Sequence, residues 1–175
     1  HVKYSIKGFE LSGVALKGSD SKRFKEIQER LSVLSNQFSK NVLQATNSWK
    51  KSVSIDDLNG YGEAELSKVR KGDDYVVSLQ IPVYIDLMTY AENRGLREEV
   101  YRAYISRASD VGITPVKFDN RKVMDEILKL RSEMSILLGL SNYAEYSVQS
   151  KMVDSPESVI DFLEKLVNLS HLQAK

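Results

Sequence analysis

The run MTYAENRGLREEVYRAYISRASD, residues 88–110, is the most distinctive stretch of this 175-residue chain. At its start and just before it, apolar residues recur at the spacing of one helix face, at Tyr84, Leu87, Met88 and Ala91. Gly95 then interrupts helix-favouring sequence and is expected to end this first helix. A second apolar stripe follows at Leu96, Val100, Ala103, Tyr104 and Ala108. The run therefore predicts two helices joined by a turn.

Charged residues occupy the face opposite the second stripe, at Arg97, Glu98, Glu99 and Arg102. Glu98 precedes Arg102 by four residues, which is the favourable order for an ion pair along a helix. We expect this face to be solvated. A helix–turn–helix without any catalytic role therefore explains most of the run.

The same run resembles the oligopeptidase A group of the thimet-oligopeptidase-like zinc metallopeptidases, family M3. Three other segments are similar to the amino-terminal half of that family: FKEIQERLSVLSNQFSKNVLQATNSW (residues 24–49), SLQIPVYIDLMTYA (78–91) and LRSEMSILLGLSNYAEYSVQSKM (130–152). These segments follow in the family's order and extend over nearly the whole chain. The resemblance implies that residues 1–175 are the amino-terminal helical portion of an oligopeptidase A-like metallopeptidase.

Helices are predicted outside this run as well. The clearest begins at Ser19 or Asp20, carries an apolar residue every three or four positions, and extends to about Asn47. By contrast, the glycines among residues 1–18 argue against one regular element there. Further helices, each with its own start or stop signal, are predicted from Asp119 or Asn120 to Gly139, from Asn142 to Lys151, and from Pro156 onward.

Two short segments between the long helix and residues 88–110 alternate polar and apolar residues, as half-buried strands do. They predict a small two-stranded β element at about residues 51–55 and 75–81, with Pro82 ending the second strand. Residues 63–69 favour a short helix between the strands. Because the chain has no internal repeat and no linker rich in Pro, Gly and Ser, we predict a mainly α fold in a single multi-helix domain, residues 1–175.

Composition limits the classes of partner. A net charge of +1 and a pI near 8.0 disfavour nucleic acid or an acidic membrane as partners. The basic groups Lys50-Lys51 and Lys68, Arg70, Lys71 are expected to be solvated turns. No apolar run approaches the ~18 residues that a membrane span needs. The absence of cysteine excludes a disulfide framework and fits a cytoplasmic location.

A zinc site cannot be assembled from this sequence. The resemblance implies H-E-x-x-H on a helix, which supplies two imidazoles as ligands and a glutamate that activates water. The chain has only His1 and His171, and neither lies in that motif. The sequence therefore predicts no catalytic residue and no metal ligand, and the resemblance implies that zinc is bound outside this segment.

Other candidate sites have ordinary structural explanations. The pairs Asp56-Asp57 and Asp73-Asp74 adjoin turn-forming residues, so we interpret them as turns and not as catalytic acids. Asn168 begins a glycosylation sequon on a predicted helix, which we attribute to chance. Two interpretations stay open for four aromatic residues, which either line a peptide-binding groove or pack in the core: Tyr101, Tyr104, Tyr143 and Tyr146.

The resemblance implies a parent zinc metalloendopeptidase whose substrates are short peptides. In that family the amino-terminal helical part forms one wall of a deep channel, and a carboxy-terminal catalytic half holds the zinc. On this hypothesis the segment alone is inactive and exposes an apolar surface, with Phe162 and Leu169 of the last helix as candidates. The alternative is a free-standing helical interaction module without enzymatic activity. The substrate-binding residues stay unknown under either hypothesis.

Overall fold

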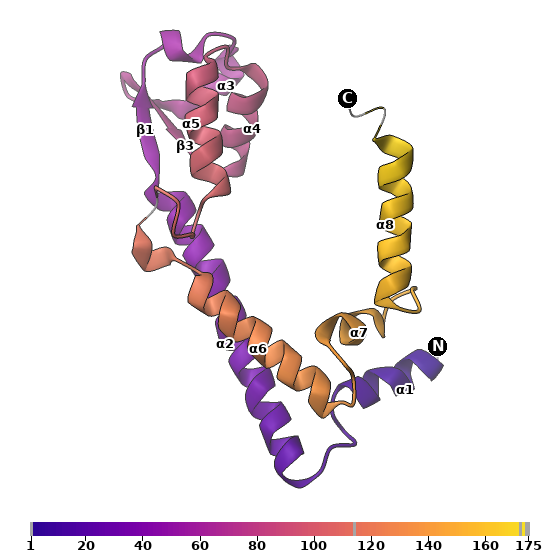
Figure 1. The fold of residues 1–175 in the computed structure, drawn as a ribbon. Helices are drawn as coiled ribbons and strands as arrows, with labels where there is room; N and C mark the ends of the chain where they lie inside the picture. The colour runs from indigo at the N-terminus through magenta and orange to yellow at the C-terminus, as the bar shows by residue number, and fades with distance from the viewer. Residues whose placement is uncertain (1, 114, 172, 174–175) are drawn as a thin grey trace. The chain divides into compact units, whose positions relative to one another are not determined.

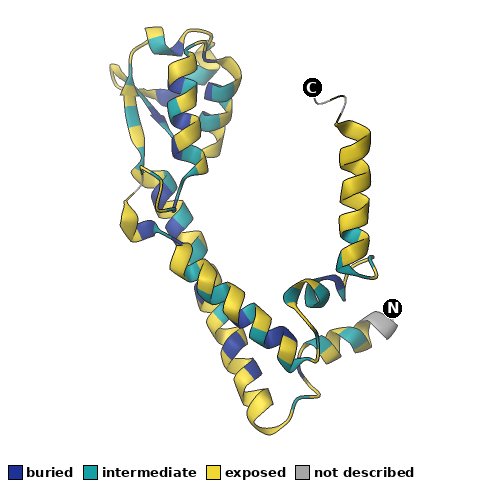
Figure 2. Cartoon of the chain, in the orientation of Figure 1, coloured by how far each residue is buried: buried dark blue, intermediate teal, exposed yellow. Residues whose placement is uncertain are grey.

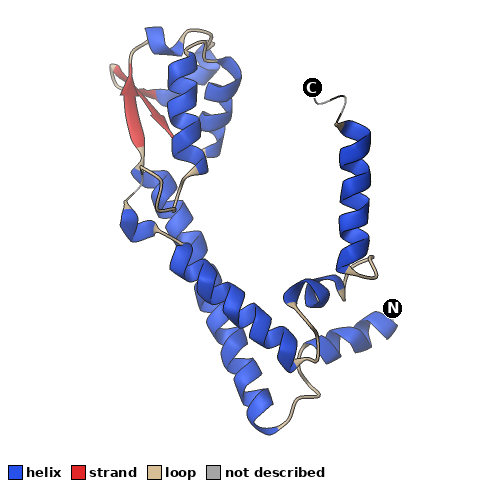
Figure 3. Cartoon of the chain, viewed as in Figure 1, coloured by secondary structure: helices blue, strands red, loops and turns tan. Residues whose placement is uncertain are grey.

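The computed structural model describes residues 2–113, 115–171 and 173, and most of them are helical (Figure 1, Figure 3). In this part of the chain the α-helices are α1 (Val2–Leu11), α2 (Gly18–Ser48), α3 (Glu63–Val69), α4 (Ile81–Tyr90), α5 (Arg94–Ile105), α6 (Arg121–Leu137), α7 (Tyr143–Val148) and α8 (Pro156–Ser170). The remaining elements are two short 3-10 turns, η1 (Asp56–Leu58) and η2 (Val116–Phe118), and the strands β1 (Lys50–Val53), β2 (Arg70–Lys71) and β3 (Asp74–Ser78). The predicted mainly α fold with a small β element is confirmed.

The chain divides into two compact units. The terminal unit comprises His1–Val33 and Glu126–Lys175, and the central unit comprises Leu34–Asp125. The boundaries fall inside α2 and inside α6. Compact units do not decide whether the chain folds as one domain, so the single domain of residues 1–175 stays a prediction.

The sheet of the central unit is antiparallel, with the strand order β1-β3-β2. Lys50 of β1 lies opposite Ser78 of β3, and Lys71 of β2 lies opposite Asp74 of β3. The expectation of two strands misses β2, because two residues are too few to show an alternating pattern. β2 joins β3 through a two-residue turn with Gly72 first, where its positive φ of 65° favours glycine.

The second predicted strand, 75–81, extends too far along the chain. β3 ends at Ser78, and Ile81 and Pro82 belong to the first turn of α4. The first N–H groups of a helix have no partner within the helix, so a proline without an N–H is well placed there. Pro82 therefore starts a helix and does not end a strand.

The core of the central unit lies between one face of the sheet and the helices α3, α4 and α5 (Figure 2). Val77 of β3 is fully buried there, and Leu87 of α4 and Val100 of α5 pack in the same cluster. The other buried members are Leu58, Val69, Leu79, Val83, Ala91, Leu96 and Ala103. The predicted apolar stripes face this core as far as Tyr104, whereas Ala108 lies beyond the end of α5 and packs with Ala45 and Phe118.

The helix–turn–helix predicted from residues 88–110 corresponds to α4 and α5, but its turn lies before Gly95. The Asn93 side chain accepts a hydrogen bond from the Leu96 N–H at 3.0 Å and caps the start of α5. Gly95 lies in the first turn of α5. An asparagine cap, and not the glycine, therefore separates the two helices.

Polar contacts complete the central unit. The predicted ion pair along α5 is present, with Glu98 Oε1 at 2.8 Å from Arg102 Nη2. Two buried amides also join α2 to the start of α6: Asn41 Nδ2 donates to Asn120 Oδ1 at 2.8 Å, and Asn120 Nδ2 donates to the Phe38 carbonyl at 3.1 Å. Because a buried amide without partners destabilises a fold, these bonds make the pairing of Asn41 with Asn120 specific.

In the terminal unit, residues 2–18 do not form one regular element, as expected, but the helix α1 occupies the first part of them. Gly8 lies inside this helix in open space, where glycine weakens a helix by about 1 kcal/mol relative to alanine without breaking it. Gly13 and Gly18 lie beyond its end and have positive φ values of 79° and 58°. These two glycines therefore shape the connection between α1 and α2.

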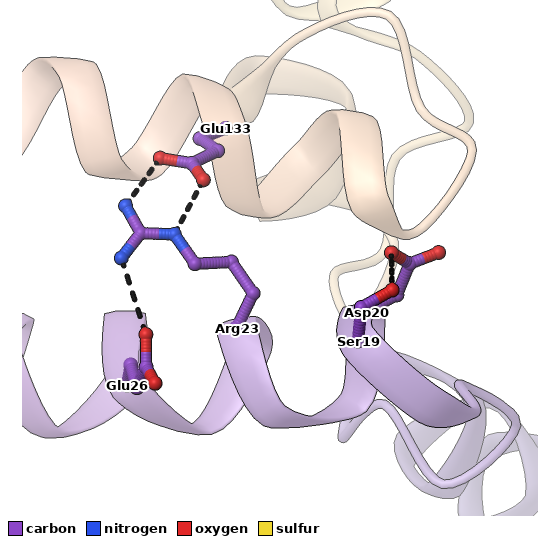
Figure 4. Close-up of polar contacts among 5 residues, drawn as sticks. All are labelled: Ser19, Asp20, Arg23, Glu26 and Glu133. Atoms are coloured by element: carbon purple, nitrogen blue, oxygen red, sulfur yellow. Dashed lines mark hydrogen bonds and ion pairs between the residues drawn. The ribbon is translucent and has the colours of Figure 1, made fainter.

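Two arginine–glutamate pairs join α2 to α6 within the terminal unit, and Figure 4 shows one of them. Arg23 donates from Nε and Nη2 to the two carboxylate oxygens of Glu133 at 2.6 and 2.8 Å, and Arg30 contacts Glu126 in the same way at 2.6 and 2.8 Å. The arginines advance by seven residues while the glutamates go back by seven, so the helices run antiparallel here. Apolar residues of the same helices are buried: Phe24, Ile27, Leu130 and Met134.

The last two helices begin at their predicted caps. Asn142 Oδ1 accepts a hydrogen bond from the Glu145 N–H at 3.0 Å, and Ser155 Oγ accepts one from the Ser158 N–H at 3.2 Å. α7 ends at Val148, three residues before the expected position. Across the residues that the structure describes, no helix combines the length and the apolar character that crossing a membrane requires.

Candidate functional site

The acidic pair Asp56-Asp57 lies in η1 and is held as a turn. Asp57 Oδ2 accepts hydrogen bonds from the Ser54 N–H and hydroxyl at 3.0 and 2.8 Å, and Asp57 Oδ1 accepts one from Asn93 Nδ2 at 2.9 Å. The bonds from Ser54 hold the pKa of Asp57 below its usual range. A carboxylate kept ionised in this way is a weak base, so the geometry fits a structural turn.

The structure describes one of the two histidines and allows a search for groups of metal ligands. His171 directly follows α8 and is exposed, whereas His1 lies outside the described residues. Among the side chains that the structure describes, no group of three His, Cys, Asp or Glu residues could hold a metal ion.

The four tyrosines of the sequence analysis divide between the two units. In the central unit, Tyr104 stacks on Tyr84 with ring centroids 3.8 Å apart, and Tyr101 is 45% exposed. In the terminal unit, Tyr143 and Tyr146 stack with ring centroids 5.3 Å apart. Tyr104 is therefore engaged in packing, and a peptide-binding role for these rings stays a prediction.

A cavity of about 630 Å³ is lined by residues of α2 and α4 together with Arg107. Its apolar lining is Phe38, Val42, Leu43, Ile81 and Pro82. Arg107 is already engaged by protein groups, because its Nη1 donates to Thr46 Oγ1 at 3.0 Å and its Nε donates to the Tyr104 carbonyl at 2.8 Å. This cavity therefore offers an apolar surface beside Arg107, whose guanidinium already donates hydrogen bonds to other residues of the protein.

A second cavity in the central unit has a volume of about 400 Å³ and a different chemistry. Three lysines line it, Lys50 from β1, Lys68 from α3 and Lys71 from β2, and no carboxylate of the described residues does. The rest of its lining is Thr46, Asn47, Val76, Ser78, Gln80 and Val83. We call this cavity the basic pocket.

Sequence reasoning missed the basic pocket because its lysines were interpreted as separate solvated turns. The basic residues next to Lys50 and Lys71 in the sequence form ion pairs. Lys51 Nζ lies 2.5 Å from Glu99 Oε2, and Arg70 Nη1 lies 3.4 Å from Glu63 Oε1. Lys50 and Lys71 are far apart in the sequence and line one pocket because β1 and β2 pair with the same strand. The available signal was the two-residue turn after Lys71, which predicts a hairpin there.

The apolar face of α8 is exposed from Ile160 to Leu169, whereas Val159 near the start of the helix is half-buried (Figure 2). Phe162 is 60% and Leu169 is 68% exposed, as expected from the sequence. The main apolar stripe is exposed too, at Ile160, Leu163, Leu166 and Val167. None of the described residues of this helix is buried. Because proteins rarely leave a continuous apolar face in water, α8 is a candidate contact surface.

Comparison with known proteins identifies the family. A profile described as Peptidase family M3 matches residues 87–174, which is 88 of the 175 residues. The chain is 44% identical to "Oligopeptidase A" of Escherichia coli and 43% identical to "Oligopeptidase A" of Haemophilus influenzae, in both cases over 99% of this chain and 27% of the relative. It is 39% identical to "Probable cytosolic oligopeptidase A" of Arabidopsis thaliana, over 97% of this chain and 25% of the relative.

The chain thus spans about a quarter of the length of the curated relatives it matches. The profile covers half of the chain, and the identity to the relatives extends over nearly all of it. These findings agree with the resemblance predicted from residues 88–110 and the three other segments. The chain therefore belongs to peptidase family M3.

Proposed function

We propose that this chain is the amino-terminal, non-catalytic portion of a zinc metallopeptidase that hydrolyses short peptides. Its membership of family M3 and its identity to relatives named oligopeptidase support the proposal. The chain spans about a quarter of those relatives, so the proposal assigns peptide hydrolysis to the whole protein. The described residues offer no group that fits a zinc ion, and the proposal places zinc outside this segment. We place the parent protein in the cytoplasm, as the name of one relative suggests for that relative.

On this proposal the segment acts through its shape, as one wall of a deep channel. A narrow channel admits flexible peptides and excludes folded proteins, so selection by size does not depend on any single residue here. The exposed apolar face of α8 supports a segment that packs against other parts of a larger protein. Covering a large apolar side chain contributes about 1.5–3 kcal/mol, so several such side chains provide a strong driving force for that packing.

The test uses the product of the complete gene. Its zinc content is measured, together with the cleavage of a short quenched peptide with and without a chelator. We expect one zinc per chain and cleavage that stops with the chelator and returns with added zinc. A folded protein that contains the same peptide in a structured region should resist cleavage, because it cannot enter the channel.

The second candidate function is a free-standing helical interaction module, which the exposed face of α8 also favours. The same experiment separates the two candidates. A complete gene product without zinc and without cleavage would overturn the peptidase proposal and leave the interaction module. Cleavage of the folded protein at the rate of the free peptide would overturn the channel-wall role alone.

A further inference from the structure

Four residues that line the basic pocket lie on the face of the central sheet that is turned away from the core, whereas Lys68 and Val83 reach the pocket from α3 and α4. Side chains alternate along a strand, and Val77 is buried in the core, so Val76 and Ser78 face the opposite way. Lys50 lies opposite Ser78 in the register and shares that face. Lys71, at the other end of β3, lies on the same face. Strand pairing therefore brings two lysines to one surface from opposite edges of the sheet.

Two of the three lysines in the pocket have no charged partner among the residues that the structure describes. Lys68 Nζ lies 2.6 Å from Asp86 Oδ2, so its charge is compensated. Lys50 and Lys71 make no ion pair within 4.0 Å with any residue that the structure describes, and this includes Asp74, which lies opposite Lys71 in the register. Since the described lining of the pocket contains no carboxylate, its positive charge favours an anionic ligand.

The rest of the lining limits the kind of anion. Val76 and Val83 supply an apolar wall, and the side chains of Asn47, Ser78 and Gln80 supply neutral hydrogen-bonding groups. The volume of about 400 Å³ falls within the range of small-molecule sites. A small inorganic anion would contact the lysines but would leave the valines without an apolar partner. A ligand with an anionic group and an apolar body uses both parts of the lining.

We propose that the basic pocket binds a carboxylate group carried on an apolar body, of the kind found at the free carboxyl end of a short peptide. Lys50 and Lys71 bind the carboxylate, and Val76 and Val83 contact the adjoining apolar side chain. The choice of a peptide as the source of the carboxylate rests on the proposed function. The site itself is defined by charge and shape.

The test measures binding to the full chain without any hydrolysis. N-acetyl-leucine, N-acetyl-leucinamide and inorganic phosphate are titrated separately and followed by calorimetry and by chemical-shift changes. N-acetyl-leucine should bind at least about tenfold more tightly than the amide, a factor that corresponds to ~1.4 kcal/mol, and more tightly than phosphate. Its affinity should fall as the salt concentration rises, because the charges of exposed lysines are screened.

The variant that removes the two charges is K50M/K71M, in which methionine retains an apolar stem. Both lysines are exposed, so we expect the fold to persist, and circular dichroism and thermal unfolding check this. The matched control is K40M/K122M, which removes two exposed lysines of the central unit that do not line the pocket. N-acetyl-leucine should bind at least about tenfold more weakly to K50M/K71M and unchanged to the control.

Three results would overturn the proposal: equal binding of the acid and its amide, equal loss of binding in both variants, or binding of phosphate as tight as that of N-acetyl-leucine. The last result would indicate a general cationic surface. A complete gene product that fails to cleave peptides would overturn the proposed function but would leave this binding result intact. The two failures are therefore distinguishable.

Discussion

The ring of Tyr84 on α4 lies parallel to the ring of Tyr104 on α5, with a centroid distance of 3.8 Å and an angle of 13° between the planes. The Arg107 guanidinium lies 3.6 Å from the centroid of the Tyr104 ring, so it covers the face that Tyr84 leaves free. Arg107 also donates to the Thr46 hydroxyl on α2 at 3.0 Å. The Tyr104 ring on α5 thus contacts α4 through Tyr84 and is connected to α2 through Arg107.

Replacing Tyr104 should destabilise the central unit through this stack. We expect Tyr104→Leu to lower the free energy of unfolding by about 2 kcal/mol, because it removes an aromatic pair and a cation–π contact. Tyr104→Phe keeps the ring and should stay within about 0.5 kcal/mol of the parent chain. Urea unfolding of the three proteins checks this. Equal stability of the leucine and phenylalanine variants would show that the stack contributes nothing.

Gly60 is expected to tolerate no side chain. A Cβ at this position would lie 2.0 Å from the Tyr90 carbonyl oxygen, and its φ of 96° is unfavourable for other residues. Gly60→Ala should therefore destabilise by more than about 2 kcal/mol. Gly72→Ala is the control, since it has a positive φ but open space around it and should cost only about 1 kcal/mol. Thermal unfolding that shifts equally in both variants would contradict the clash.

The two arginine–glutamate pairs of the terminal unit predict an acid-dependent contribution to stability. Hydrogen bonds from Arg30 and Arg23 lower the pKa of Glu126 and Glu133 from the usual value of 4.5. A carboxyl group whose pKa is lower in the folded than in the unfolded state stabilises the folded state. This stabilisation is complete at pH values above the pKa of the unfolded state, and it is lost as the pH falls through the pKa of the folded state. E126Q/E133Q should therefore unfold at a lower temperature than the parent at pH 7, and the difference should shrink below pH 4.5.

Both pairs are partly exposed, so salt should weaken the same difference. Glu29→Gln is the control, because Glu29 is exposed on α2 and forms no ion pair within 4.0 Å among the described residues. A difference between parent and double variant that stays constant from pH 7 to pH 3 would exclude the ion pairs as its origin.

Tyr61 has a buried hydroxyl without a hydrogen-bond partner among the described residues. Tyr61→Phe removes that unsatisfied group, so it should leave the free energy of unfolding unchanged or raise it by up to about 1 kcal/mol. Burial raises the pKa of Tyr61 to about 12, so the unfolded chain loses this proton first. The parent should therefore lose stability as pH rises from the usual value of 10.0 toward 12, and the phenylalanine variant should lose less. Guanidinium unfolding at pH 7 and at alkaline pH measures both effects.

The exposed face of α8 predicts opposite effects in the segment and in the complete protein. Phe162→Ser with Leu169→Ser should leave the stability of this chain within about 0.5 kcal/mol of the parent, because both side chains are already in water. In the complete gene product the same changes should lower the unfolding temperature. Phe24→Ser is the control, since Phe24 is 3% exposed and its loss should cost about 3–5 kcal/mol in either protein. Unchanged stability of the complete product would show that nothing covers this face.

Local patterns were sufficient to predict most of the helices. α2 and α6 repeat apolar residues every three or four positions, and Asn142 and Ser155 mark helix starts through their own side chains. The errors in the predicted helices occurred at glycines, which are found both at helix ends and inside helices. Gly95 was interpreted as a helix breaker, but it lies inside α5, which the Asn93 cap and buried side chains stabilise, and Gly8 lies inside α1.

The basic pocket could not be predicted in the same way, because it depends on contacts between distant residues. Lys50 and Lys71 flank β3 near its two ends, and only the register of both strand pairs places them on one face. The pairing of Lys51 with Glu99 likewise required the position of α5 over the sheet. The family was accessible from sequence because it depends on matching segments along the chain and not on geometry.

β1 begins with Lys50 and Lys51 and lies at one edge of the three-stranded sheet. An edge strand offers unpaired backbone N–H and C=O groups to any strand of another molecule, and lysines at such an edge oppose this pairing through charge repulsion and the loss of hydration. The strand has only four residues, which further limits the length over which a foreign strand could bond to it. Because Lys51 is paired with Glu99, it is the charge of Lys50 that opposes edge-to-edge aggregation, whether or not Lys50 also holds a ligand.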